Sequence, residues 1–413
     1  MQLFSGFEYL CIDIANHYGK DKLLFNERIE WVNNNINNLE SLSDKADKKP
    51  TYIKAVQTLR KAQQGIATGH LVEWDAVCSG VQIMSAVTGC YAGANSTGLI
   101  NPEERADAYS KTTEEMQKIL GNGFMVSRAD AKSALMKSTY GSKKVPIEIF
   151  GEDTEELNAF YQAVQIVAPG AWTLLQELLG AWQPWALVHS WKLPDGFDAR
   201  VKVMNKKDVR IEVDELDHAT FSYTYYENQG EKSGLSLVAN TIHSIDAYLL
   251  RCMHRRCNYD AVVVAIAHKA IDEELDLRSQ GFTDQVAGAT GKLAYYIEQY
   301  ERSAMADVVI LGWLKDGYST QHLSTKHLTQ LRAIVQGMEA YAPFELVTIH
   351  DAFKCHANNA NYLRWQYKEI LAELAESNIL GDVLSQIHGV QGTYDKLSNN
   401  LGDLIRGSNY ALS

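Results

Sequence analysis

The chain has 413 residues and a formal net charge of −12, with 46% hydrophobic and 22% charged residues. This composition is ordinary for a globular protein with a substantial core, and the acidic balance argues against a simple cationic coat for nucleic acid, although local basic grooves stay possible. Six scattered cysteines form no CxxC pair, which argues against a zinc site and fits a reducing cytoplasm. Residues 1–14 lack the basic start and apolar core of a signal peptide, and the longest apolar run, residues 261–267, is too short to cross a bilayer. We therefore expect a cytoplasmic protein with no membrane segment.

The pattern of apolar residues predicts a chain that is mainly helical, with a few short strands. The expected elements are helices over 25–38 and 51–68, a strand over 71–74 followed by a helix up to 88, an amphipathic helix over 102–121, a helix over 127–140, an apolar helical region over 154–188, a hairpin with strands 201–213 and 219–226, a helix over 324–340, a strand over 344–349 and a helix over 359–377. This order indicates a mainly helical α+β fold.

The helix expected over 127–140 carries the most informative residues. Arg128 and Lys132 are four residues apart and therefore share one face, and Tyr140 follows two turns later. Gly141 suits the helix exit. Two cations and a phenol on one side of a helix can hold a triphosphate, a sugar and a base. Taken alone, the pattern also fits a solvated helix face.

Two aspartates favour the phosphate interpretation. Asp75 ends the strand over 71–74, and Asp351 follows His350 at the end of the strand over 344–349. One acid after a strand is usually a turn or cap residue, but two such acids on either side of a phosphate-binding helix indicate a paired Mg²⁺ site. Two Mg²⁺ ions of this kind can hold the attacking and leaving oxygens of a displacement reaction.

These residues together resemble the single-subunit DNA-directed RNA polymerases of bacteriophages and mitochondria. The run DAVCSGVQ over 75–82 resembles motif A of that family, residues 128–141 resemble its motif B, and HDAF over 350–353 resembles its motif C, in the family's order. Further resemblance lies in segments 101–111, 193–203 and 239–251 and in the C-terminal tail. The motifs together are highly specific, although each piece alone is not.

The resemblance implies a role for each matching residue. Asp75 and Asp351 would be catalytic metal ligands, with Ala76 contributing its carbonyl where the family has glycine. Lys132 would be catalytic and would also bind the triphosphate, and the other substrate-binding residues would be Arg128, Tyr140, Gly141, Tyr109, His243, His350 and Gly80. His243 is the least secure of these, because the chain between it and Asp351 is longer than in the family and holds His322 and His327.

The resemblance also implies an architecture and partners. It predicts the palm and fingers of a right-hand polymerase, lacking the thumb and the N-terminal promoter domain. The expected boundaries are palm over 1–103, fingers over 104–243 with a specificity-loop-like hairpin at about 201–232, and palm over 244–413 with an insertion at about 255–320. The chain then resembles the larger, catalytic subunit of a two-polypeptide phage enzyme in the cytoplasm of an infected bacterial host. Its partners would be a companion chain, DNA template and promoter, ribonucleoside triphosphates and the RNA product.

Two other functions stay open. Related DNA polymerases share the three motifs, but they carry a glutamate where this chain has Gly80, and usually another at Ala352, so both positions favour ribonucleotides. The chain could also be a non-catalytic polymerase subunit. Against this, both expected metal ligands are present.

Overall fold

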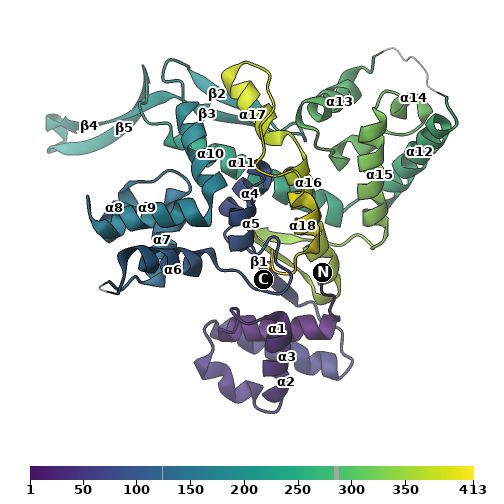
Figure 1. Ribbon diagram of the computed structural model, residues 1–413, viewed down its shortest axis with the longest axis horizontal. Coiled ribbons are helices and arrows are strands. Elements are labelled where there is room, and N and C mark those ends of the chain that lie inside the picture. Colours follow the sequence, from purple (N-terminus) through teal and green to yellow (C-terminus); the bar gives the residue numbers. More distant parts are fainter. Residues whose placement is uncertain (123, 283–287) are drawn as a thin grey trace.

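The computed structural model describes residues 1–122, 124–282 and 288–413, which form a mainly helical structure with three small antiparallel sheets (Figure 1). The expected mainly helical α+β class is confirmed. The helices are α1 (Gly6–Tyr18), α2 (Phe25–Asn34), α3 (Lys49–Gln63), α4 (Ser79–Thr88), α5 (Tyr91–Ser96), α6 (Ala108–Leu120), α7 (Arg128–Ser138), α8 (Lys144–Phe150), α9 (Glu155–Val167), α10 (Pro169–Gly180), α11 (Leu235–Cys257), α12 (Ala261–Ser279), α13 (Gly291–Ser303), α14 (Gly317–Thr320), α15 (Thr325–Glu339), α16 (Ala360–Glu376), α17 (Ile379–His388) and α18 (Leu401–Gly407). The strands are β1 (Leu71–Asp75), β2 (Val188–Lys192), β3 (Asp198–Lys202), β4 (Met204–Val213), β5 (Ala219–Gly230), β6 (Val347–Ile349) and β7 (Ala352–His356).

The central sheet joins two distant parts of the chain. Its strand order is β1-β7-β6, so β7 pairs with β1 on one side and with β6 on the other. Val72 and Trp74 alternate with more exposed residues along β1 and point into the core, as expected of a half-buried strand. The last residues of the chain return to this sheet, because the Ser413 amide donates to the Asp75 carbonyl at 3.0 Å.

Helices α4, α11 and α16 pack against one another beside this sheet and form the main core. All ten residues of α4 are buried, which matches a helix that is apolar on most of its faces. Gln82 in α4 donates to the Thr97 and Ala411 carbonyls at 3.0 and 2.9 Å and accepts from the Tyr367 hydroxyl at 2.7 Å. This buried amide ties α4 to α16 and to the C-terminal tail.

Helices α1–α3 form a bundle on one side of the central sheet (Figure 1). The buried Arg28 of α2 donates to the carbonyls of Leu23 and Asp21 at 2.9 and 2.7 Å. These bonds hold the loop that precedes α2. They therefore position Lys22, which lies between the two carbonyls.

Helices α6–α9 form a second group with its own core around Met116, Leu135 and Phe160. The expected apolar helical region over 154–188 contains two helices, α9 and α10, which are separated at Pro169, and it ends at Gly180 instead of continuing to residue 188. Proline has no amide hydrogen to continue a helix and is favoured at the first helical position. Beyond this group, β4 and β5 project as a long hairpin (Figure 1).

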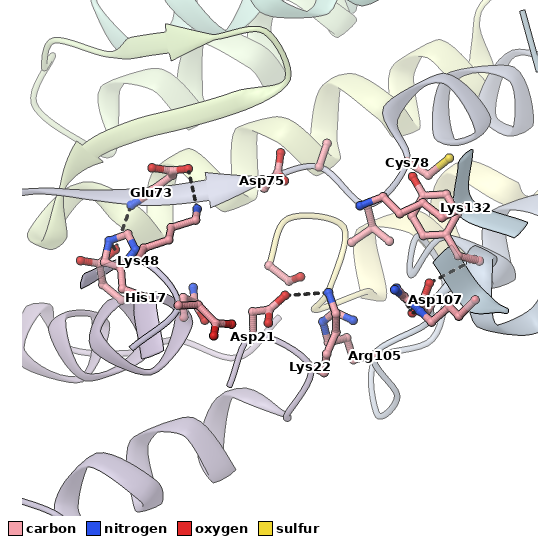
Figure 2. Close-up of a pocket in the computed structure, with 18 residues that line it drawn as sticks. His17, Asp21, Lys22, Lys48, Glu73, Asp75, Cys78, Arg105, Asp107 and Lys132 are labelled. Atoms are coloured by element: carbon pink, nitrogen blue, oxygen red, sulfur yellow. Dashed lines mark hydrogen bonds and ion pairs between the residues drawn. The ribbon is translucent and has the colours of Figure 1, made fainter. Parts of the chain in front are cut away.

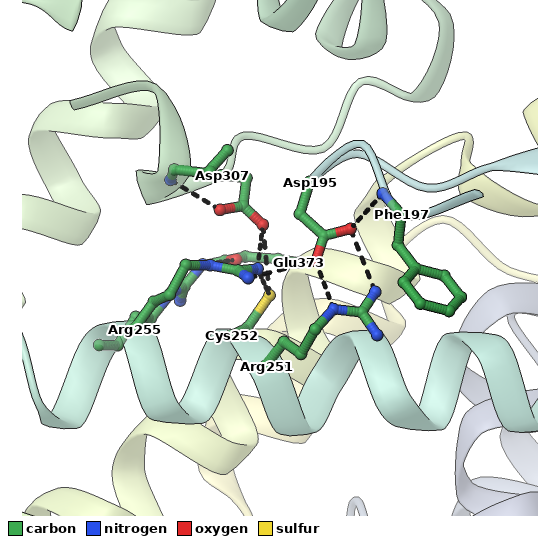
Figure 3. Close-up of polar contacts among 9 residues, drawn as sticks. Asp195, Phe197, Arg251, Cys252, Arg255, Asp307 and Glu373 are labelled. Carbon is green, nitrogen blue, oxygen red and sulfur yellow. Dashed lines mark hydrogen bonds and ion pairs between the residues drawn. The ribbon is translucent and has the colours of Figure 1, made fainter. Parts of the chain in front are cut away.

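A third core lies over residues 264–338 and includes Ile271, Leu311 and Leu331. It extends past the expected insertion limit of residue 320, because α15 packs against α12. A polar network joins this unit to α11: Arg255 contacts Asp307 at 2.7 Å and Asp195 at 3.2 Å, and Arg251 contacts Asp195 at 2.5 Å (Figure 3). Helix α11 therefore connects the third core to the main one.

The cysteines and the apolar character of the helices were the sequence features that concerned redox state and membrane association. All six cysteines are free thiols. Within the described ranges, no helix combines the length and the apolar character that crossing a membrane requires.

Candidate active site

Asp75 and Asp351 meet at the end of the central sheet. Asp75 is the last residue of β1 and pairs with Ala352, the first residue of β7. The Ala76 amide donates to the Asp351 carbonyl at 3.3 Å. The structure thus brings the two predicted acids, far apart in sequence, to neighbouring backbone positions.

The backbone at both acids is held in uncommon conformations. His350 and Asp351 form the short turn between β6 and β7, and His350 has φ +54°. Cys78, which precedes α4, has φ +58°. A positive φ is uncommon for residues with a Cβ and is enriched at functional sites. The turn exposes His350 and leaves Asp351 half-buried.

A third carboxylate, that of Asp246 on α11, lies in the same region. Burial and the nearby Asp351 raise the pKa of Asp246 from 3.8 to about 6. The pKa of Asp75 is also raised to about 6, first by burial and then by Asp351. Acids that disfavour each other's charge are ready to accept a cation. Aspartate oxygens are the ligands that Mg²⁺ prefers, so the donor set fits that ion.

A cavity of about 330 Å³, called here the Asp75 cavity, opens beside the first acid (Figure 2). Five lysine and arginine residues line it: Lys22 from the loop before α2, Lys48 directly before α3, Arg105 from the segment before α6, and Arg128 and Lys132 from α7. The Lys132 ammonium lies 5.4 Å from the centre of the Tyr109 ring. The cavity therefore places several cations within reach of Asp75, as binding of a polyphosphate requires.

Arg128 is already engaged in this structure. Its guanidinium contacts Asp107 at 2.5 Å, and its Nε also donates to Ser110 at 3.1 Å. Asp107 in turn is the N-cap of α6 and accepts from the Tyr109 amide at 3.1 Å. The predicted phosphate-binding arginine thus lines the cavity while paired with an acid. Lys132, by contrast, makes no salt bridge with any acid of the described ranges.

A second cavity of about 560 Å³, called here the Tyr140 cavity, lies on the other side of Asp75. Its lining includes Asp351, His350, Tyr140, His243 and Asp246. The two cavities share Asp75, Ala76, Cys78, Tyr109 and Lys132. The site therefore has one side with both basic and acidic groups and one side with aromatic groups, and both sides include Asp75. The further acids on the first side are Asp13, Asp21, Asp47, Glu73 and Asp107.

Tyr140 is packed tightly in the second cavity. Its ring centre lies 4.8 Å from that of His243. A Cβ at Gly80 would lie 2.5 Å from the Tyr140 hydroxyl, so glycine at this position gives that hydroxyl its space. Gly141 has φ +90°, which favours glycine and ends the helical segment directly after Tyr140.

The structure places His243 in the lining of the Tyr140 cavity, and neither His322 nor His327 lines either cavity. His327 is buried in the third core, where its ring stacks on Tyr300 with centres 3.6 Å apart. Burial lowers the pKa of His327 to about 3. His243 extends from α11 toward Tyr140 instead.

Sequence reasoning missed Lys22, Arg105 and Asp246. Lys22 and Arg105 lie in irregular segments with no periodic pattern to mark them. Asp246 stands three residues after His243 on α11, so it shares a helix face with that histidine. This spacing is the sequence signal that could have identified Asp246, and it is informative only after His243 has been assigned to the site.

A further group of possible metal ligands lies away from these cavities. In the part of the chain that the structure describes, the one cluster of three such residues is Glu212, Asp214 and His218 at the exposed tip of the β4–β5 hairpin. Exposed acidic groups of this kind are common without an ion. The hairpin cluster is therefore not part of the candidate site.

Comparison with known proteins concerns the first third of the chain. Residues 4–145 match the family model of the DNA-dependent RNA polymerases. A DNA-directed RNA polymerase of Pseudomonas phage phiKMV is 29% identical over 123 residues, which cover 26% of this chain and 15% of that polymerase. The match thus spans a small part of the relative, and the family segment includes Asp75, Arg128, Lys132 and Tyr140.

Proposed function

We propose, from the match of residues 4–145 to the DNA-dependent RNA polymerase family model, that the chain is a phage-type polymerase that catalyses template-directed RNA synthesis from ribonucleoside triphosphates. One observation carries the proposal: Asp75 and Asp351 adjoin at the end of the central sheet, beside the two cavities that Lys132 of α7 lines. An aspartate that only ended a strand or formed a turn would not require a second aspartate beside it.

Mg²⁺ is the cofactor that these residues suit. Asp75, Asp351 and the carbonyl of Ala76 would hold it, because hard oxygen donors match this ion. When bound, the metal supplies Lewis-acid stabilisation of the attacking and leaving oxygens.

Different parts of the nucleotide would bind in the two cavities. The Asp75 cavity suits the triphosphate, with Lys132, Lys22 and Arg128 near its anionic oxygens. The Tyr140 cavity suits the sugar and base, with Tyr140 and His243 as the ring and hydrogen-bonding groups. Tyr109 lies where the two meet, and its contact with the Lys132 ammonium supports a role in orienting that cation. His350 borders the sugar side from the turn before Asp351. Gly141 lies outside the lining of both cavities and would act by ending the segment that carries Tyr140.

The reaction forms one bond and breaks another. The 3′-oxygen of the RNA bonds to the α-phosphorus of the nucleotide, and the bond from that phosphorus to the bridging oxygen breaks. The 3′-hydroxyl loses its proton to solvent, and pyrophosphate leaves with a proton that Lys132 donates. Fixed cations at the departing oxygens stabilise the charge that develops there.

Ribonucleotides are the better fit for the sugar side. Gly80 has no side chain, and the Tyr140 hydroxyl lies against the space that a Cβ would fill. A glutamate at this position would displace Tyr140. We infer that Tyr140 senses the 2′-hydroxyl and that His243 hydrogen-bonds to it.

We further infer the larger assembly from the family. The central sheet with α4, α11 and α16 would be the palm, and α6–α10 the fingers. The β4–β5 hairpin would contact DNA, and its exposed Phe221, Tyr223 and Tyr225 support this role. A companion polypeptide would supply thumb and promoter-binding elements, and the exposed apolar Leu3 and Phe7 at α1 offer it a contact surface.

The decisive experiment is extension of an RNA primer annealed to a DNA template, with Mg²⁺ and either ribo- or deoxynucleotides. The chain is tested alone and co-expressed with a companion. We expect extension with ribonucleotides, and its loss in Asp351→Asn but not in Asp276→Asn, which removes an exposed acid of α12. An Asp351→Asn variant that still extends the primer would refute the assignment.

The sugar assignment has its own test. Tyr140→Phe removes only the hydroxyl, so we expect continued extension with weaker rejection of deoxynucleotides. Unchanged discrimination between the two sugars would contradict the role of Tyr140. A preference of the wild-type chain for deoxynucleotides would indicate a DNA polymerase. A lack of extension with the companion bound would indicate a non-catalytic subunit.

A further inference from the structure

Arg105 and Lys48 are the lysine and arginine residues lining the Asp75 cavity that neither the sequence motifs nor the proposed mechanism uses, and Lys48 is paired with Glu73 at 3.8 Å. Arg105 has no such partner within the described ranges. It lies in the irregular segment before α6 and lines the cavity together with Lys22, Arg128 and Lys132. Figure 2 shows it across the cavity from β1, in the same region as Asp21, Lys22 and Asp107. Its side chain therefore approaches the site from the side opposite Asp75.

The guanidinium of Arg105 has unused hydrogen-bonding capacity. Its Nε is shielded from solvent and has no hydrogen-bond partner among the described residues. Two of the three acids that act on it are paired with other cations, because Asp21 contacts Lys22 at 2.6 Å and Asp107 contacts Arg128 at 2.5 Å, and the third, Asp75, makes no salt bridge with Arg105 within the described ranges. A buried donor without a partner costs stability, which indicates a ligand that completes it.

The electrostatics of the segment agree with this conclusion. Burial lowers the pKa of Arg105, and the neighbouring Arg128 contributes in the same direction, while Asp21, Asp107 and Asp75 oppose the shift. A guanidinium stays protonated at neutral pH in any case. A positive charge held partly desolvated beside a second arginine is stabilised by an added anion, and a phosphate can accept two parallel bonds from the guanidinium.

We propose that Arg105 binds the outer phosphates of the incoming nucleotide and the pyrophosphate that leaves. Arg105 is available for this role in the structure, whereas Arg128 is paired with Asp107. This inference rests on the proposed function and identifies a phosphate-binding residue beyond motif B. Arg105 and Lys132 are the two cations of this side of the cavity that make no salt bridge within the described ranges. Together they would hold the polyphosphate from opposite ends, with Asp75 near the reacting phosphorus.

The test measures binding directly, so that it does not depend on polymerisation. Isothermal titration calorimetry compares inorganic tripolyphosphate, UTP and UMP on the full chain, with and without Mg²⁺. Arg105→Gln is expected to weaken tripolyphosphate and UTP binding by roughly ten- to a hundredfold, the value of a hydrogen bond to a charged group. UMP binding should change little. Arg105→Lys should lose less, because it keeps the charge but not the fork.

The matched control is Arg332→Gln. It removes an arginine of α15 that pairs with Asp272 outside both cavities, and it should bind all three ligands as the wild type does. Circular dichroism and thermal melting confirm the fold of each variant, and Arg105→Lys remains informative if Arg105→Gln is unstable.

Several results would overturn the inference. The first is an Arg105→Gln variant that binds tripolyphosphate as tightly as wild type. The second is an Arg105→Gln variant that loses UMP and tripolyphosphate binding equally, or that loses only primer–template binding. The third is a wild-type chain that does not bind tripolyphosphate. The proposed function fails separately. If the chain never extends a primer but loses tripolyphosphate binding in Arg105→Gln, the Arg105 site stands as a polyphosphate site and the polymerase proposal falls.

Discussion

Replacing Asp246 by asparagine is expected to stabilise the protein at neutral and alkaline pH. Burial, and then the charge of Asp351, raise the pKa of Asp246 from 3.8 to about 6 in the folded chain. The folded state thus binds this proton more tightly than the unfolded state, so the stability that Asp246 contributes is present below pH 3.8 and is lost as the pH rises through 6. Asparagine keeps the size of the side chain and removes the charge.

The size of the effect follows from the same pKa values. At about 1.4 kcal/mol for each pH unit, a rise from 3.8 to about 6 corresponds to about 3 kcal/mol at pH 8. At pH 5 Asp246 is mostly protonated in the folded state, and linkage leaves about half of that difference. The gain from Asp246→Asn should therefore shrink by roughly half between pH 8 and pH 5.

Urea denaturation at several pH values measures this difference. Asp276→Asn serves as control, since it removes an exposed acid of α12 outside both cavities. In the background of Asp351→Asn the gain from Asp246→Asn should be smaller, because one source of the raised pKa has gone. A gain that stays constant from pH 5 to pH 8, or an Asp246→Asn variant less stable than wild type at pH 8, would refute the reasoning.

Three further predictions concern the third core and the hairpin. Because burial lowers the pKa of His327 to about 3, the folded state resists protonation, and wild type should lose about 2 kcal/mol between pH 7.5 and pH 5. His327→Phe, which can still stack on Tyr300, should abolish that part of the loss in the same denaturation series; an unchanged pH slope would contradict this. Asp307→Ala should lower the free energy of unfolding by about 3–5 kcal/mol, because it removes the nearer of the two carboxylates that pair with the half-buried Arg255 and also the cap of the Val309 amide. A loss below about 1 kcal/mol would show that Asp195 and solvent replace the carboxylate. Tyr223→Ala should weaken DNA binding, since stacking on a base contributes about 1–3 kcal/mol; equal affinity in a fluorescence anisotropy titration would remove the hairpin from the DNA interface.

The elements of the chain were largely predictable, because helix and strand periodicity is a local property. The strand ending at Asp75 and the motif B helix lie where the pattern predicts them. The helix expected from residue 102 begins at Ala108, where the Asp107 side chain caps it. The strand expected to start at residue 344 begins only at Val347, since the Phe344 amide donates to the Cys257 carbonyl instead of joining the sheet. Tertiary contacts set such boundaries, and a local pattern does not contain them.

The candidate site also combines features that a sequence pattern contains with features that depend on tertiary contacts. Residue types and spacing indicate Asp75, Asp351, Lys132 and Tyr140 as candidates, because phosphate, metal and sugar each demand particular side chains, and the family resemblance adds the roles proposed for them. They do not reveal the salt bridge that engages Arg128, which depends on how the segment before α6 packs against α7.

The sequence by itself determined the order of the elements and the chemical groups available for the reaction. Only the tertiary structure decided which groups meet. Asp75 and Asp351 adjoin through the register of β1 with β7, and Arg105 and Asp246 reach the cavities from segments distant in the chain. The physical reason is that strand register and helix packing are set by burial of apolar surface over the whole core, whereas a sequence pattern reports only on neighbours along the chain.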